Sequence, residues 1–282
     1  MLISQLKIQF IESLKDEFPL TEIESFFYIL TEHFLDVRRI DLALNRDLEI
    51  SEEQFSKFEK AMLRLKDHEP VQYITGLTEF YGLEFEVNKN VLIPRPETEE
   101  LVDWIIHDHQ NTEEELHVLD IGTGSGCIPI CLAKNLKNAS VSSFDISKDA
   151  LALAKRNALR NNVEVNFREF DILSLEKLDG KYGIIVSNPP YVRELEKKEM
   201  HRNVLEHEPE LALYVDDNDA LVFYQKITQL AADGLSDNGK LYFEINQYLG
   251  EETKALVENF GFVAELKKDI FGNYRMLKAI RK

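Results

Sequence analysis

Cysteine and long apolar runs are scarce in this sequence of 282 residues. Its two cysteines, Cys127 and Cys131, stand four apart in a predicted helix, a spacing that suits neither a disulfide nor zinc. We therefore expect buried free thiols, a reducing compartment, the cytoplasm, and no metal site. No stretch approaches the roughly 18 apolar residues of a membrane span, and segment 1–18 lacks the apolar core of a signal peptide.

Positive charge is also in deficit. Lysine and arginine total 33 against 51 acidic residues, which gives a formal net charge of −18. Non-specific binding to nucleic acid depends on basic surface, so this balance opposes it without excluding a local basic groove. The charge favours a basic protein partner over bare DNA, and no membrane partner is expected.

The length allows two domains, and the patterns change along the chain accordingly. Residues 1–70 predict an all-helical N-terminal domain, with capping boxes at Thr21–Glu24 and Ser51–Gln54 that each precede an amphipathic apolar stripe. Residues 71–95 show short alternating apolar positions between turn residues, which predicts a β-hairpin linker.

Residues 96–282 alternate between strand and helix patterns. We expect strands at 117–121, 140–146, 163–170, 182–187, 240–245, 262–270 and 274–280, and helices at 127–136, 148–160, 221–232 and 251–260. Such alternation builds a mostly parallel sheet with helices on both faces. The predicted fold class is therefore α/β, with a seven-stranded sheet.

A glycine-rich loop, DIGTGSG at 120–126, follows the first of these strands. Glycines let a backbone come close to a ligand, and a helix N-terminus offers free N–H groups. The dinucleotide fingerprint GxGxxG needs a glycine at 127, where this chain has Cys127. The spacing GxGxG favours S-adenosylmethionine (AdoMet) over NAD, although an ordinary tight turn remains the alternative.

Two aspartates strengthen this interpretation. Asp145 ends the second strand, where a carboxylate can accept both ribose hydroxyls, and Asp171 ends the third, where it can read an adenine edge. The carboxyl ends of parallel strands line one crevice, which is where open α/β sheets bind ligands. Together with the loop they predict a nucleoside-bearing cofactor.

The segment SNPPYV, 187–192, follows the fourth strand, next to the glycine loop across the sheet. Asn-Pro also favours turns, so a rigid corner is the alternative. An amide or exocyclic amine is a poor nucleophile, and its methylation requires acceptors that bind both N–H hydrogens as positive charge develops. The Asn188 side-chain oxygen and the Pro189 carbonyl supply two acceptors, and Tyr191 supplies a flat face.

NPPY after such a loop is shared by adenine-N6 and cytosine-N4 DNA methyltransferases and by glutamine-N5 methyltransferases. Four further segments narrow the choice: EPVQYITG at 69–76, VLIPRPETEELVDW at 91–104, EPELAL at 208–213 and DIFGNYR at 269–275. With them, nearly the whole chain closely resembles the release-factor glutamine N5-methyltransferase family.

That resemblance implies a class I Rossmann-like methyltransferase domain over 96–282, with an N-terminal domain that helps hold a release factor. It implies methylation of the glutamine in the GGQ loop of peptide chain release factors, with AdoMet as donor and S-adenosylhomocysteine as product. The cofactor residues would be Asp120, Gly122, Thr123, Gly124, Ser125, Gly126, Asp145, Asp171, Ile172 and Asn188. The catalytic and substrate residues would be Asn188, Pro189, Pro190 and Tyr191.

Arg95 and Glu97 carry two interpretations, a local role at a helix start and a role in closing over substrate. His201 and His207 lack metal-ligand spacing and are expected on the surface of a mobile loop. Competing functions are adenine-N6 methylation of nucleic acid, AdoMet binding without catalysis and, weakest, an NAD oxidoreductase. We expect a monomer that does not bind nucleic acid directly.

Overall fold

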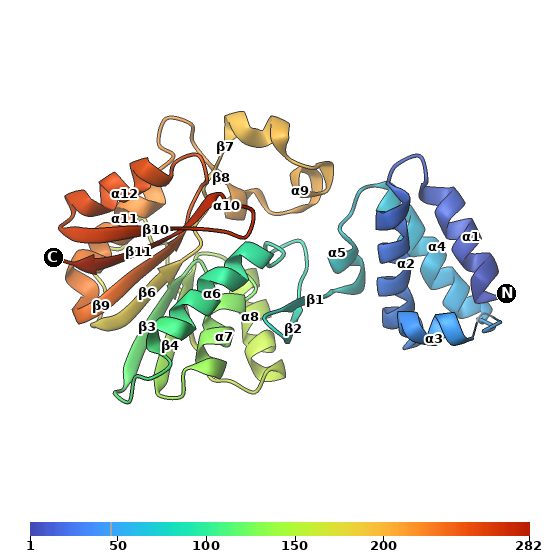
Figure 1. Ribbon diagram of the computed structural model, residues 1–282, viewed down its shortest axis with the longest axis horizontal. Coiled ribbons are helices and arrows are strands. Elements are labelled where there is room, and N and C mark those ends of the chain that lie inside the picture. Colours follow the sequence, from blue (N-terminus) through green and yellow to red (C-terminus); the bar gives the residue numbers. More distant parts are fainter. Residues whose placement is uncertain (46) are drawn as a thin grey trace. The chain divides into compact units, whose positions relative to one another are not determined.

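The computed structural model describes residues 1–45 and 47–282, and its contacts divide the chain into two compact units (Figure 1). One unit comprises 1–76 with 201–207, and the other comprises 77–200 with 208–282. We call them the helical unit and the sheet unit. Within the described part of the chain, no helix is both long enough and apolar enough to cross a lipid bilayer.

The helical unit packs its helices around an aromatic core. The rings of Phe10 and Phe27 meet edge to face at 5.5 Å, and Phe58 lies 6.0 Å from Phe27. All three side chains are buried, so apolar burial holds this unit together. Its helices are α1 (Ile3–Leu14), α2 (Leu20–Leu35), α3 (Arg39–Leu44), α4 (Glu52–Lys66), α5 (Val71–Thr75) and α9 (Arg202–His207).

Of the two capping boxes expected from the sequence, the structure contains one. Ser51 Oγ accepts from Gln54 N at 3.2 Å and Gln54 Oε1 accepts from Ser51 N at 2.8 Å, which confirms the box before α4. The box at Thr21–Glu24 is wrong, since α2 begins at Leu20 with Pro19 as its N-cap. Pro19 has extended backbone and its carbonyl accepts from Ile23 N at 3.1 Å, so the helix starts earlier.

A hairpin is present within the segment where one was expected. Strands β1 (Leu77–Phe80) and β2 (Leu83–Glu86) pair antiparallel through the two-residue loop Tyr81-Gly82. Both loop residues have positive φ, as the tight hairpin turn requires. Helix α5 was not predicted from the sequence, and the domain limits 1–70, 71–95 and 96–282 stay a prediction.

The sheet unit contains a seven-stranded sheet in the order β10-β11-β9-β6-β3-β4-β5. Six strands run in the same direction, and β11 runs antiparallel to its neighbours β9 and β10. The strands are β3 (Leu116–Ile121), β4 (Ala139–Asp145), β5 (Asn166–Glu169), β6 (Tyr182–Ser187), β9 (Leu235–Glu244), β10 (Phe262–Lys268) and β11 (Tyr274–Arg281). The predicted mostly parallel, seven-stranded fold is confirmed.

Successive side chains along each strand point alternately into two separate cores, one on each face of the sheet. Val118 and Ile184 pack with helices α6 to α8, whereas Leu119 and Ile185 pack with α11 and α12. This period of two is what a sheet covered on both faces requires. The covering helices are α6 (Pro96–His109), α7 (Cys127–Asn135), α8 (Lys148–Arg160), α11 (Val222–Gly234) and α12 (Gly250–Asn259).

Cys127 and Cys131 are both free and buried within the core on the α7 face, as the sequence predicted. Burial raises the pKa of the Cys127 thiol to about 12, so the group stays protonated. These thiols act as small apolar side chains rather than as nucleophiles or metal ligands.

The chain between β6 and α11 forms short elements where a loop was expected. They are β7 (Val192–Arg193), a 3₁₀ turn η1 (Glu194–Glu199), α9, α10 (Glu210–Leu213) and β8 (Tyr214–Val215), which pairs with β7. His207 lies half-buried in α9, with Nε2 at 2.6 Å from Asp67 O, and exposed His201 directly precedes that helix. His201 is thus exposed and outside any helix, as expected, whereas the expectation of an exposed loop is wrong for His207, which contacts within the helical unit hold in α9.

Candidate active site

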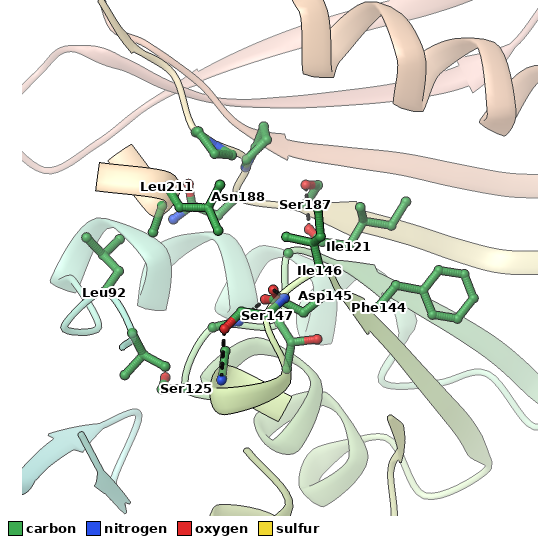
Figure 2. A pocket seen from close by; sticks show the side chains of 18 of the residues that line it. Leu92, Ile121, Ser125, Phe144, Asp145, Ile146, Ser147, Ser187, Asn188 and Leu211 are labelled. Atoms are coloured by element: carbon green, nitrogen blue, oxygen red, sulfur yellow. Dashed lines mark hydrogen bonds between the residues drawn. The ribbon is translucent and has the colours of Figure 1, made fainter. Parts of the chain in front are cut away.

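A pocket of about 460 Å³ opens in the sheet unit at the carboxyl ends of the parallel strands (Figure 2). The chain order reverses between the adjacent strands β3 and β6, so the loops after them diverge and leave a crevice. Ser187 Oγ donates to Ile121 O at 2.6 Å and closes the floor between these two strand ends. All the lining residues belong to the sheet unit.

The glycine loop after β3 forms one wall of this pocket. Gly122, Gly124 and Gly126 all have positive φ, a backbone conformation that other residues adopt only with strain. A Cβ on Gly126 would lie 2.9 Å from Ile130 Cδ1 and 3.1 Å from Ala154 Cβ. The glycine therefore lets α7 begin directly against α8, with its N-terminal N–H groups near the pocket.

Asp145 at the end of β4 holds the glycine loop and faces the pocket (Figure 2). Its Oδ2 accepts from Gly124 N at 2.9 Å and its Oδ1 accepts from Ser147 N at 2.8 Å. Burial raises the pKa of this carboxyl group. Each oxygen keeps a further lone pair, which a pair of vicinal hydroxyls could fill.

Asp120 lies beneath the loop and is not among the residues that line the pocket. Its Oδ2 accepts from Ser143 Oγ at 2.5 Å, and Thr123 Oγ1 lies 2.5 Å from the same hydroxyl. Burial raises the pKa of Asp120 to about 7. The structure therefore gives Asp120 a supporting position under Thr123, whereas the sequence predicted a direct contact with cofactor.

One end of the pocket, which we call the apolar slot, is lined by Ile146, Ile172 and Leu173. Ile172 is nearly buried in the wall, and the partly exposed side chains of Ile146 and Leu173 form the rim. Asp171 stands beside them and uses Oδ1 to accept from Leu173 N at 2.9 Å. Such a slot, with polar atoms at one edge, suits a flat heterocycle.

Ser125 supplies an unsatisfied polar group in the loop. Its hydroxyl is buried and, apart from the weakly bonding thiol of Cys127, has no hydrogen-bond partner among the described residues, although the side chain lines the pocket. A buried orphan hydroxyl costs free energy unless a ligand pairs with it. Gly122 to Gly126, Asp145 and the apolar slot together therefore fit a nucleoside with a charged extension.

The NPPY corner forms the wall of the pocket next to the glycine loop. Asn188, Pro189 and Pro190 line the pocket, and a Cβ on Gly122 would lie 3.5 Å from Asn188 O. Asn188 Nδ2 donates to Thr98 Oγ1 at 3.4 Å. Tyr191 does not line the pocket, and its hydroxyl donates to Glu244 Oε1 at 2.9 Å instead.

Arg95 and Glu97 lie at the start of α6, where Arg95 is the N-cap and Pro96 follows it. Arg95 lines the pocket and pairs with Glu208, whose side chain is fully buried. Glu208 Oε2 also accepts from Ile93 N at 3.2 Å, so the segments 91–104 and 208–213 close one rim together. Glu97 does not line the pocket. It lies in the first turn of the helix, a position that agrees with a local role at the helix start.

Sequence reasoning missed Thr98, Glu208 and Glu244. The first two lie inside segments noted only for their resemblance, and Glu244 is an ordinary strand end in the sequence. Within the described residues, no group of three or more His, Cys, Asp or Glu side chains could hold a metal ion.

The strand order, the glycine loop and the polar corner at one crevice define a Rossmann-like methyltransferase domain. A methyltransferase structure from Pyrococcus furiosus shares this fold, with a TM-score of 0.52 and 18% identity over 81% of this chain and 98% of that chain. The family model of the methyltransferase small domain matches residues 104–212, and that of the PrmC N-terminal domain matches 8–76.

Curated relatives give the family. The release factor glutamine methyltransferase of Flavobacterium psychrophilum is 56% identical over 99% of both chains. The enzyme of that name from Bacteroides thetaiotaomicron is 45% identical over 96% of this chain and 97% of its own. The chain belongs to the release factor glutamine methyltransferase family, which confirms the resemblance seen in the sequence.

Proposed function

We propose that this protein transfers a methyl group from AdoMet to the side-chain amide N5 of the glutamine in the GGQ motif of peptide chain release factors. The observation that carries the chemistry is the position of Asn188, which lines the pocket with its backbone oxygen next to Gly122 of the glycine loop. Family membership supports the substrate class. Release factors act in the cytoplasm, where two free thiols would stay reduced.

The residues of the pocket fit AdoMet. Asp145 would accept the ribose hydroxyls, the slot beside Ile172 and Asp171 would take the adenine, and the loop at Gly122 to Gly126 would hold the methionine part. When bound, AdoMet supplies an electrophilic methyl group on a sulfonium. The Ser125 hydroxyl offers a further donor or acceptor to the same ligand.

The corner would make the glutamine amide reactive by binding its hydrogens. Asn188 Oδ1 and the Pro189 carbonyl accept the two N–H groups, so the nitrogen is held in line with the methyl group. Both oxygens would stabilise the positive charge that develops on the nitrogen as it takes the methyl group. One amide proton would then pass to water, which leaves the neutral N5-methyl amide.

Labelled methyl transfer tests this function. The protein is incubated with methyl-labelled AdoMet and purified release factor, beside a factor whose GGQ glutamine is replaced by alanine, and with duplex DNA as a separate acceptor. We expect label on the unaltered factor only. Label on DNA or on the altered factor, with none on the unaltered one, would overturn the proposal.

Asn188→Ala tests the corner itself. Removal of a preorganised group that stabilises transition-state charge typically costs about 10²–10³ in kcat, and we expect a loss of that size. AdoMet affinity, measured by calorimetry, should change little because Asn188 mainly contacts the acceptor amide. Asn166→Ala, an exposed asparagine on β5, serves as the control. Wild-type kcat in Asn188→Ala would show that the corner is only a rigid turn without a catalytic role.

A further inference from the structure

A buried carboxylate lies behind the corner and has no part in the chemistry described so far. Glu244 ends β9, next to β6 in the sheet, and is 1% exposed. Its Oε2 accepts from Thr98 Oγ1 at 2.6 Å and its Oε1 accepts from Tyr191 OH at 2.9 Å. Thr98 is itself buried and lies within reach of Asn188.

With Glu244 ionised, the donors and acceptors of this network permit one arrangement. A carboxylate only accepts, so the single hydrogen of the Thr98 hydroxyl is committed to Glu244. Thr98 Oγ1 can then only accept from Asn188, which turns Nδ2 of that amide toward Thr98. The Asn188 oxygen is left facing the pocket.

We propose that Glu244 and Thr98 are positioning residues for methyl transfer, which fix the Asn188 amide with its oxygen toward the acceptor nitrogen. This inference rests on the proposed function, because the orientation matters only if the acceptor presents N–H groups. The distance of 3.4 Å from Asn188 Nδ2 to Thr98 Oγ1 is at the long end of the hydrogen-bond range. The same carboxylate holds Tyr191, and the Tyr224 hydroxyl donates to the Glu244 carbonyl at 3.2 Å to brace the strand end.

The negative charge of Glu244 is essential to this arrangement. In Glu244→Gln, the new amide group can donate to Thr98, which frees the Thr98 hydrogen for the Asn188 oxygen. Asn188 would then present N–H groups to an acceptor that also presents N–H groups. Tyr191 keeps a partner through the remaining oxygen, so the change is one of polarity rather than of volume.

Kinetics on the full-length protein with release factor test the proposal. Thr98→Val keeps the shape and removes the hydroxyl, and we expect kcat to fall by about 10- to 100-fold, somewhat less than for loss of a direct stabilising group. Glu244→Gln should show a similar fall, and Thr98→Ser should restore kcat to within about threefold because it keeps the hydroxyl. KM for the release factor and the dissociation constant of AdoMet should both stay within about threefold of wild type, because the lost interaction acts on the transition state.

Thr228→Val is the matched control. Thr228 is fully buried on α11 in the same unit, and its hydroxyl has no partner among the described residues. We expect this variant to keep wild-type kcat, which separates loss of the Thr98 hydroxyl from a general effect of valine in the core. Wild-type kcat in Thr98→Val, or an equal loss in Thr98→Ser, would overturn the proposal.

Nuclear magnetic resonance of the Asn188 side-chain amide gives a readout that does not need activity. The signal is assigned by its disappearance in Asn188→Asp. We expect it to shift in Thr98→Val and Glu244→Gln and to stay in place in Thr98→Ser and Thr228→Val. Unmoved signals in the first two variants would refute the positioning role, even if release factor is methylated. These shifts without any methylation of release factor would instead refute the proposed function alone.

Discussion

At the scale of single residues, Asp120 shows how a buried acid supports a loop of the pocket without lining the pocket itself. It is fully buried, and its Oδ1 has no hydrogen-bond partner in the described part of the chain. Burial raises the pKa of this group to about 7, while the hydroxyl of Ser143 lowers it. Thr123 in the glycine loop therefore rests on a network whose charge changes near neutral pH.

This predicts a pH-dependent contribution of Asp120 to stability. The folded chain keeps a proton that the unfolded chain releases above about pH 4, so this contribution falls as pH rises from about 4 to about 7. Asp120→Asn removes the titration. Denaturant unfolding at a series of pH values should show that wild type loses more stability across this range than the variant does. Parallel curves for the two proteins would contradict the prediction.

At the scale of elements, Asn157 on α8 joins the hairpin to the glycine loop. Its Oδ1 accepts from Glu86 N at 2.7 Å, and its Nδ2 donates to Glu86 O at 3.0 Å and to Ser125 O at 2.9 Å. The side chain is completely buried. One asparagine therefore satisfies three backbone groups on two segments that lie about 40 residues apart in sequence.

Asn157→Ala should destabilise the sheet unit by about 2–4 kcal/mol, because it leaves buried backbone groups without partners. AdoMet should also bind more weakly, since Ser125 loses the bond that holds its backbone in place. Urea unfolding and calorimetry measure the two effects. Exposed Asn166→Ala, the control, should stay within about 0.5 kcal/mol of wild type. Unchanged AdoMet affinity in Asn157→Ala would show that Asn157 does not couple the hairpin to the glycine loop.

The elements with strong periodicity were predictable from the sequence, and the short ones were not. Helix α8 has the predicted bounds, Lys148–Arg160, because its apolar positions recur at helical spacing after the N-cap Ser147. The elements between 192 and 215 are too short to show a period, and distant contacts hold them, such as that of Asn246 with Glu196. In the same way, no sequence spacing joins Thr98 to Glu244, because only the fold brings them together.

At the scale of the whole molecule, the division into two units separates cofactor binding from the proposed grip on the release factor. All the pocket-lining residues belong to the sheet unit. The helical unit contains the segment 8–76 that matches the PrmC N-terminal domain. We therefore assign substrate-protein binding to the helical unit as part of the proposed function.

Residues 77–282, produced alone, should test this assignment. We expect this fragment to bind AdoMet within about threefold of the full chain, which is under 1 kcal/mol. Its kcat/KM for release factor should fall at least about tenfold, equivalent to about 1.4 kcal/mol of lost docking contacts. Calorimetry and labelled methyl transfer measure the two quantities. Undiminished kcat/KM in the fragment would show that residues 1–76 of the helical unit are dispensable for the substrate.

The segment 201–207 belongs to the helical unit although residues 77–200 precede it in the chain. At roughly 5–20 residues per second, a ribosome needs on the order of 10 s to add that intervening stretch. The first helices therefore leave the ribosome well before α9, whose His207 contacts the Asp67 carbonyl. The ribosome translates the corner at 187–191 before it translates α9. The helical unit therefore gains its last contacts only after the proposed reactive centre has been translated.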